Sequence, residues 1–214
     1  MSKPVIREPM RSNSRSNRAR ILATARQELG RNPDVTLEEI ARAAGVVRRT
    51  LFGHFPGRAA LLDALAEEAS EALRGSAART PDAEEAPRRA LARFVLSIWP
   101  VGDRYRLLLA LARQDLGTER VSEILTPARN EATAILERGQ RAGVFHDRLP
   151  ATVLSVALEA LTLSLLESVN TGAWEDDGTR AAVATLVAAG VAEKEATAIV
   201  EGVASEMRAV TSDG

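Results

Sequence analysis

The residues with the clearest capacity for recognition chemistry are two adjacent arginines, Arg48 and Arg49, in a short segment that follows a glycine turn. A guanidinium binds phosphate oxygens, and it can also donate two hydrogen bonds to the edge of a guanine in the major groove of DNA. Neighbouring charges on a helix most often form a solvated surface. The two arginines therefore favour nucleic-acid binding only if the surrounding elements present them together to a groove.

Groups for covalent or metal chemistry are scarce. The sequence has no cysteine and two histidines, His54 and His146. This composition excludes disulfides, thiolate nucleophiles and cysteine-bound zinc or iron–sulfur clusters, and it disfavours a histidine-rich metal site. A Gly-x-Ser-x-Gly elbow, a P-loop and a His-Glu-x-x-His motif are also missing. We therefore expect neither an enzyme nor a bound cofactor or metal.

Charge is distributed unevenly along the chain, although the formal net charge of its 214 residues is −1. Residues 1–60 contain 12 Lys and Arg against 5 Asp and Glu, a net charge of +7, and residues 61–214 contain 16 against 24, a net charge of −8. This asymmetry suggests a polyanion as partner of the N-terminal part. Residues 1–17 are basic and aperiodic, and they predict a disordered arm that either follows DNA or only increases solubility.

Neither export nor membrane insertion is expected. Residues 1–20 are rich in arginine and lack the apolar core of a signal peptide. The most apolar later stretch, residues 149–166, is interrupted by Glu159 and by several Ser and Thr, so it falls short of the roughly 20 apolar residues that span a bilayer. The sequence therefore predicts a cytoplasmic protein with no membrane partner.

Helical periodicity runs through nearly every ordered segment, so the predicted fold class is all-α. A first helix is expected from Arg18, and Gly30 with Asn32-Pro33 ends it. The tetrad Thr36-Leu-Glu-Glu39 has the pattern of a capping box and predicts that a second helix begins at Leu37. One face of the first helix is apolar and carries Ile21, Leu22, Ala25 and Leu29.

A glycine turn separates the second helix from a short third one. Gly45 can take the positive φ of a tight turn, and the small Ala41 four residues earlier lets two helices approach closely. A third helix is expected over residues 47–53 and a long fourth over residues 56–75. Short helix, glycine turn and short helix make a helix-turn-helix. This arrangement leaves five residues as candidates to meet a groove: Val47, Arg48, Arg49, Thr50 and Phe52.

The stretch from Val35 to Arg58, preceded by Arg20-Ile-Leu and followed by Leu61-Leu62, resembles the N-terminal domain of TetR/AcrR-family transcriptional regulators. The capping box, the Ala-Gly turn, Thr-Leu-aromatic, His-Phe and a basic residue occur in order over residues 18–65, under a quarter of the chain. The resemblance implies double-stranded DNA as the partner. It also implies phosphate contacts from Thr36, His54 and Arg58 and base reading by residues 47–52.

Four positions depart from the family's pattern. Val47 stands where Ser or Thr is usual, which removes a helix cap, and Phe52 stands where Tyr is common, which removes a hydroxyl donor. Gly53 is small where a larger residue often touches DNA. Arg49 occupies a position that is often small, so we expect this protein to transfer recognition from hydroxyls to a second guanidinium.

Beyond a seam at residues 76–82 the chain shows no motif. The expected domains are a basic arm (1–17), the helix-turn-helix domain with a linking helix (18–76) and, by resemblance, a larger helical bundle for ligand binding and dimerisation (77–214). Helices are expected near residues 83–99, 103–116, 119–141 with an interruption at Thr126-Pro127, 150–171, 179–189 and 192–209.

An effector site and a dimer interface are expected within this bundle. Large apolar residues at helical spacing are usually plain core, but an aromatic cluster near Pro100 is a sign of a pocket. Small residues on the helices near 150–171 and 192–209 fit either internal packing or a two-fold interface. The candidate effector-binding residues are Phe94, Ile98, Trp99, Tyr105, Leu109 and Trp174.

The combined expectation is a homodimeric transcriptional regulator, a repressor that a small-molecule effector releases from a palindromic operator. The alternative is a helical scaffold without sequence-specific DNA binding. The two readings differ in salt dependence, because DNA binding weakens steeply as salt increases.

Overall fold

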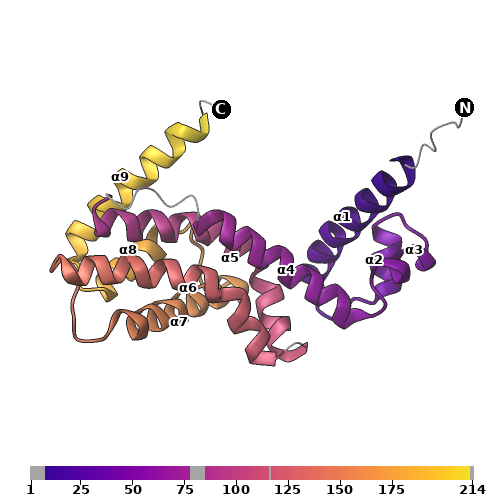
Figure 1. Cartoon of the computed structure of the whole chain (residues 1–214), viewed down its shortest axis with the longest axis horizontal. Helices are drawn as coiled ribbons and strands as arrows, with labels where there is room; N and C mark the ends of the chain where they lie inside the picture. The colour runs from indigo at the N-terminus through magenta and orange to yellow at the C-terminus, as the bar shows by residue number, and fades with distance from the viewer. Residues whose placement is uncertain (1–7, 78–84, 116, 213–214) are drawn as a thin grey trace, which may run out of the picture. The chain divides into compact units, whose positions relative to one another are not determined.

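A computed structural model of the chain describes residues 8–77, 85–115 and 117–212, with side chains described except at residues 8–13, 106–115, 118, 211 and 212. The described residues form nine helices and no strand (Figure 1), which confirms the all-α fold class. The helices are α1 (Glu8–Arg31), α2 (Leu37–Ala43), α3 (Arg48–His54), α4 (Arg58–Ala77), α5 (Pro87–Asp115), α6 (Gly117–Arg141), α7 (Ala151–Asn170), α8 (Thr179–Ala188) and α9 (Glu193–Ser212).

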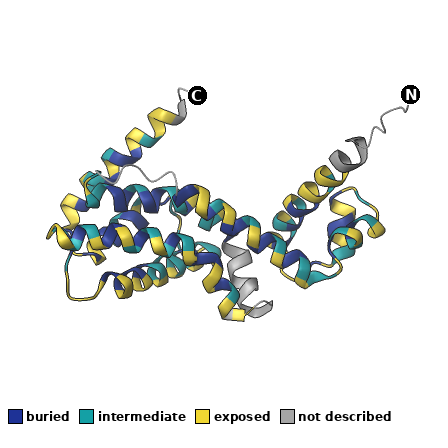
Figure 2. Ribbon diagram, viewed as in Figure 1, coloured by how far each residue is buried: buried dark blue, intermediate teal, exposed yellow. Residues whose placement is uncertain are grey.

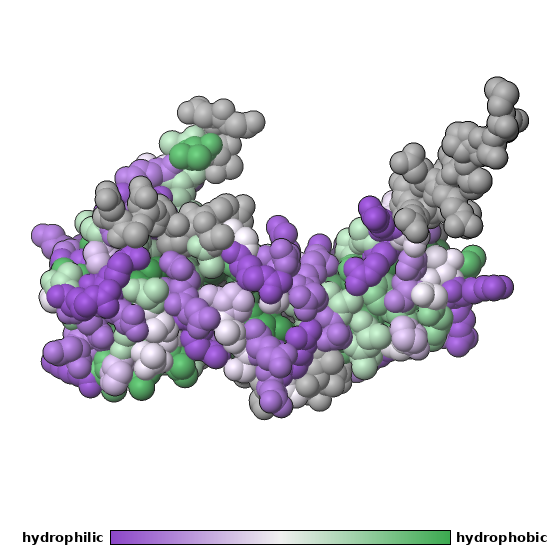
Figure 3. Space-filling model, in the orientation of Figure 1, coloured by the Kyte–Doolittle hydropathy of each residue, from purple (hydrophilic) through white to green (hydrophobic). Residues whose placement is uncertain are grey.

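The chain divides into two compact units. The N-terminal unit comprises residues 1–68 and 107–121, and the C-terminal unit comprises residues 69–106 and 122–214. The boundaries between the units therefore fall inside α4, α5 and α6. On the face shown in Figure 3, each unit carries mostly hydrophilic side chains, and smaller hydrophobic areas lie among these side chains.

The core of the N-terminal unit forms where α1 packs on α2 and α3. The predicted apolar face of α1 is buried, as is one apolar side of α2, α3 and α4 (Figure 2). Arg120, in the first turn of α6, pairs with Asp63 at 2.9 Å and with Glu67 at 3.2 Å on α4. The core residues are Ile21, Leu22, Ala25, Leu29, Ile40, Ala41, Leu51, Phe55, Leu61, Leu62 and Leu65.

Three helix boundaries differ from the sequence-based expectation. α1 begins at Glu8 and not at Arg18, so residues 8–17 are helical and the predicted disorder is wrong for them; residues 1–7 lie outside the described part. Pro9 stands in the first turn, where its missing N–H costs nothing, and no breaker follows it. α5 continues through Pro100 and α6 through Pro127. Buried residues on both sides of each proline, such as Trp99 and Leu125, compensate for the lost hydrogen bond.

The C-terminal unit buries a larger apolar core from α5 to α9, in which Leu91, Ile135, Leu136, Leu186 and Val200 are almost fully inaccessible. Ion pairs join helices that are far apart in sequence. Arg129 of α6 donates to both carboxylate oxygens of Glu159 on α7, at 2.8 and 2.9 Å. This hydrogen-bonded carboxylate raises the pKa of Arg129.

One side of α7 is apolar and exposed. Val153 and Val156 are 50% and 49% exposed, and Ala157, Ala160 and Ser164 continue the same face with exposed side chains (Figure 2). We call these five residues the α7 stripe. α7 is long and apolar enough to cross a membrane by length and composition alone, contrary to the sequence-based estimate, and only 22% of its most apolar window is buried. One such helix is weak support for a membrane span, and an exposed apolar face also suits a protein interface.

Candidate nucleic-acid interface

The capping box predicted at Thr36 is present and fixes the start of α2. The Thr36 hydroxyl accepts a hydrogen bond from the Glu39 amide at 3.2 Å, and the Glu39 carboxylate accepts from the Thr36 amide at 2.8 Å. Hydrogen bonds from the Thr36 backbone and side chain lower the pKa of Glu39. The Thr36 hydroxyl and the Glu39 carboxylate therefore both hold the start of α2. Thr36 is an exposed residue.

The turn between α2 and α3 has the predicted glycine geometry. Gly45 has a φ of +63°, which an L side chain rarely adopts. Its amide donates to the Arg42 carbonyl at 3.1 Å, and the Val46 amide donates to the Ala41 carbonyl at 3.0 Å. These two bonds make a Schellman motif. The turn therefore sets the direction in which α3 leaves the core.

Packing decides which face of α3 remains free. Leu51 is fully buried and Phe55, directly after the helix, is 1% exposed. The guanidinium of Arg18 on α1 stacks over the Phe55 ring at 5.4 Å. A residue turns about 100° per position in a helix, so residues 49 and 53 lie on the side opposite Leu51. Arg48, Arg49 and Gly53 are exposed, and Thr50 and Phe52 are half-buried.

Val47 is the residue immediately before the first turn of α3. Its side chain is 70% exposed and makes no cap hydrogen bond, as expected for valine at a position that usually carries a hydroxyl. An exposed β-branched apolar side chain at the start of this helix suits contact with a thymine methyl group.

The two arginines differ in their surroundings. Arg48 forms an ion pair with Glu38 of α2 at 3.1 Å, and its guanidinium lies over the Phe52 ring at 5.0 Å. Arg49 is exposed, and the described residues offer it no ion pair or hydrogen bond. Arg48 is therefore held against the domain, whereas the guanidinium of Arg49 is free to bind an outside partner.

The two predicted phosphate anchors occupy different environments. His54 is half-buried at the end of α3, with its ring tilted by 49° to that of Phe55 at 6.2 Å. Arg58 donates to the carbonyls of Pro33 at 2.6 Å and Val35 at 3.1 Å. Because its guanidinium ties the start of α4 to the loop before α2, Arg58 positions that loop in addition to any contact with phosphate.

Sequence reasoning missed two residues at this surface. Glu38 restrains Arg48, and Arg18 covers Phe55. Each contact joins side chains of different helices, so spacing along the chain gave no signal for it. Among the described residues, no group of three or more His, Asp or Glu side chains lies close enough together to hold a metal ion.

The predicted effector residues do not form one cluster. Phe94 is buried in the large core and Ile98 packs against that core, whereas Trp99 belongs to a smaller cluster with Leu166 and Ala181. Trp174 packs edge-on against Trp99 with ring centroids 6.1 Å apart. Tyr105 is buried, and the side chain of Leu109 lies outside the described residues.

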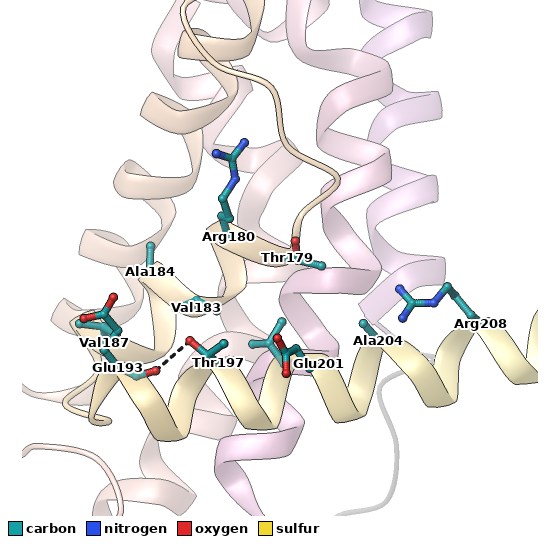
Figure 4. Close-up of a pocket in the computed structure, with 11 residues that line it drawn as sticks. Thr179, Arg180, Val183, Ala184, Val187, Glu193, Thr197, Glu201, Ala204 and Arg208 are labelled. Carbon is teal, nitrogen blue, oxygen red and sulfur yellow. Dashed lines mark hydrogen bonds between the residues drawn. The ribbon is translucent and has the colours of Figure 1, made fainter.

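A groove of about 640 Å³ lies between α8 and α9. Its lining combines apolar side chains, such as Val183 and Val200, with Arg180, Glu201 and Arg208, and Figure 4 places Glu193 and Arg208 toward opposite ends. None of the six predicted effector residues is among those that line it.

Comparison with known proteins identifies the N-terminal domain. Residues 21–65 match the family described as bacterial regulatory proteins, tetR family. Among curated proteins, no sequence match to the chain is found.

Solved structures with the same fold are distant in sequence. A tetR-family regulatory protein from Rhodococcus RHA1 is 20% identical with a TM-score of 0.67, covering 82% of this chain and 98% of that one. The fatty acid degradation regulator FadR from Bacillus halodurans is 16% identical with a TM-score of 0.69, covering 81% and 95%. RolR in complex with resorcinol is 20% identical with a TM-score of 0.53, covering 88% and 95%. The chain thus has the fold of the TetR-family transcriptional regulators, and its residues 21–65 match that family in sequence.

Proposed function

We propose that this chain is a homodimeric transcriptional repressor that binds a palindromic DNA operator and is released from it by a small-molecule effector. The observation that carries the proposal is the outward face of α3. There Arg49 is exposed and has no ion pair among the described residues, and the exposed Val47 precedes the helix, within residues 21–65 that match a family of bacterial regulatory proteins.

The chemistry of this face fits the major groove. The groove is about 12 Å wide and admits one α-helix, and guanine offers two acceptors that a guanidinium grips at once. Arg49 suits that contact, and Val47 suits a neighbouring thymine methyl. Thr36 and His54, which flank α3, are proposed to contact phosphates, with Arg58 as a weaker candidate because of its bonds to Pro33 and Val35.

The size of α3 and the α7 stripe both support the proposed dimer. α3 has seven residues, which is enough to read only a few base pairs, so useful specificity requires two copies on a two-fold site. The α7 stripe is exposed, and its Ala157, Ala160 and Ser164 permit close approach of a second helix. We propose that a second copy of the chain covers this stripe.

Effector release needs a site whose shape differs between a DNA-bound and a free state, because a ligand shifts such an equilibrium only through different affinities for the two states. The best candidate is the Trp99–Trp174 cluster together with Tyr105. Phe94, Ile98 and Leu109 remain proposed neighbours of it. The structural relative RolR binds resorcinol, so small phenols are reasonable first probes. α4 is shared by both units, and the effector would act through it.

Selection of bound fragments from random DNA tests the proposal. The expected result is a palindromic site whose affinity for the purified protein, measured by fluorescence anisotropy, falls steeply between 50 and 200 mM salt, as is usual for proteins that contact several phosphates. A reporter placed behind this site in cells should be repressed. A helical scaffold would enrich no sequence and show no salt-dependent binding.

The dimer is tested with two arginine substitutions in exposed alanines of the C-terminal unit. Ala160→Arg places a charge in the α7 stripe and should yield monomers in analytical ultracentrifugation. Ala134→Arg, at an exposed position of α6, is the matched control and should leave the dimer intact. A dimeric Ala160→Arg variant would mean that another surface joins the two copies.

A further inference from the structure

Gly53 is an exposed residue inside α3 for which the chain itself gives no structural reason. It is not among the glycines with positive φ, so an L side chain suits its backbone. A Cβ built at this position meets nothing within 4 Å. Neither the turn geometry nor the internal packing of the described residues requires glycine here.

Some other glycines of the chain do have such a reason. Gly45 has a φ of +63° in the turn between α2 and α3. Gly139 lies under the ring of Phe145, where a Cβ would come within 2.0 Å of a ring carbon. Because glycine is unfavourable inside a helix compared with alanine, Gly53 weakens α3 without an internal benefit. A local rule broken in this way is expected at functional positions.

The position of Gly53 on α3 indicates which function a glycine could serve there. It follows Arg49 by four residues, so the two lie one above the other on the same face of the helix. That face is opposite the buried Leu51. The exposed Arg49, which has no ion pair among the described residues, therefore shares this outward face with the bare backbone of Gly53 in the last turn of α3.

We propose that Gly53 is a positioning residue for DNA recognition: its missing side chain lets the α3 backbone come into van der Waals contact with a base-pair edge on the floor of the major groove. The close approach brings Arg49 within reach of the neighbouring guanine. This inference rests on the proposed function, in which α3 enters the groove, and it reverses the expectation that a small residue at this position only loses a contact.

The test is Gly53→Ala, with Gly75→Ala as the matched control. Gly75 is also an exposed helical glycine without positive φ, and a Cβ there meets nothing within 4 Å, but it lies near the end of α4. Both variants should melt at or above the wild-type temperature. Gly53→Ala should weaken binding to the selected operator at least about fivefold, roughly the loss of one base contact, and Gly53→Leu should weaken it further. Gly75→Ala should bind like the wild type.

The outcomes separate this inference from the function on which it depends. If the wild-type protein enriches no DNA sequence, the proposed function fails. If the wild type binds its operator and Gly53→Ala binds equally well or more tightly, only the role of Gly53 is overturned. A melting temperature of Gly53→Ala below that of the wild type would also overturn it, because glycine would then be required by the fold.

Discussion

The two units of this protein carry their candidate sites in different ways. In the N-terminal unit, all the proposed DNA-contacting residues fall between Thr36 and Arg58, a segment of two short helices and a turn. In the C-terminal unit, the contacts that matter join distant segments, such as Trp99 with Trp174 and Arg129 with Glu159. A site built from local geometry can be read from residue spacing, whereas one built from long-range packing requires the tertiary structure.

The two units also differ in the chemistry of the side chains that they expose to solvent. α3 presents a free guanidinium and an exposed valine to solvent, and these suit a charged, grooved partner. α7 presents valines and alanines, which suit an apolar partner. The N-terminal unit therefore fits binding to DNA and the C-terminal unit fits binding to another protein chain.

The largest expected effect comes from Leu51→Ala, which tests whether the units are separable. Leu51 is fully buried between α3 and the rest of the N-terminal core, and such a truncation costs about 2–5 kcal/mol. DNA binding should be lost while hydrogen exchange in α7–α9 remains as slow as in the wild type. Faster exchange throughout the C-terminal unit would show that the two units unfold together.

Arg49→Ala tests how the two adjacent arginines of the DNA-binding surface differ. If Arg49 reads a guanine, its loss should cost about 1–3 kcal/mol and relax the preference at one base pair of each half-site. Arg48→Ala should relax sequence preference less, because Glu38 and Phe52 already hold that guanidinium. Anisotropy titrations against operator variants measure both. An equal loss on every sequence would make Arg49 a phosphate contact.

Gly139→Ala perturbs only the C-terminal unit. A Cβ at this position collides with the buried ring of Phe145, and overpacking of this kind costs about 1–3 kcal/mol. Urea unfolding should show the loss, while operator affinity well below the melting temperature stays unchanged. Wild-type stability in this variant would mean that the ring moves aside freely.

Thr36→Ala removes the capping box at the start of α2. The hydrogen bonds from Thr36 lower the pKa of Glu39 in the folded protein. The stabilisation is therefore complete above the ordinary pKa of a glutamate and is lost as the pH falls through the lowered value. The melting temperature of Thr36→Ala should be below that of the wild type at pH 7, and the gap should narrow in acid. A gap independent of pH would exclude Glu39 from this effect.

The smallest expected effect is that of Glu38→Gln. The pair of Glu38 with Arg48 is exposed to solvent, and pairs of this kind contribute at most about 1 kcal/mol. Removing the carboxylate eliminates one negative charge from the DNA-binding surface, so affinity for all DNA should rise a few-fold at low salt. Weaker binding would show instead that Glu38 orients Arg48 for a contact with DNA.

These differences explain how much the sequence alone could predict. The capping box at Thr36 and the positive φ at Gly45 follow from local rules of helix geometry, and both predictions are confirmed. Helix breaks were expected at Pro100 and Pro127, and these predictions are wrong. Buried residues on both sides of each proline keep α5 and α6 continuous despite a missing hydrogen bond. The role of Glu38 was not predictable, since only the crossing of α2 and α3 brings it to Arg48.

The pairing of Trp99 with Trp174 provides the protein with an optical probe of its own. The chain has no other tryptophan, and the Trp99 indole donates to the Asp176 carbonyl at 3.3 Å while Arg180 lies 4.7 Å over the Trp174 ring. Intrinsic fluorescence excited at the red edge of absorption therefore reports on one place in the C-terminal unit. A titration that changes this emission therefore detects an effector that binds at this cluster, without any label.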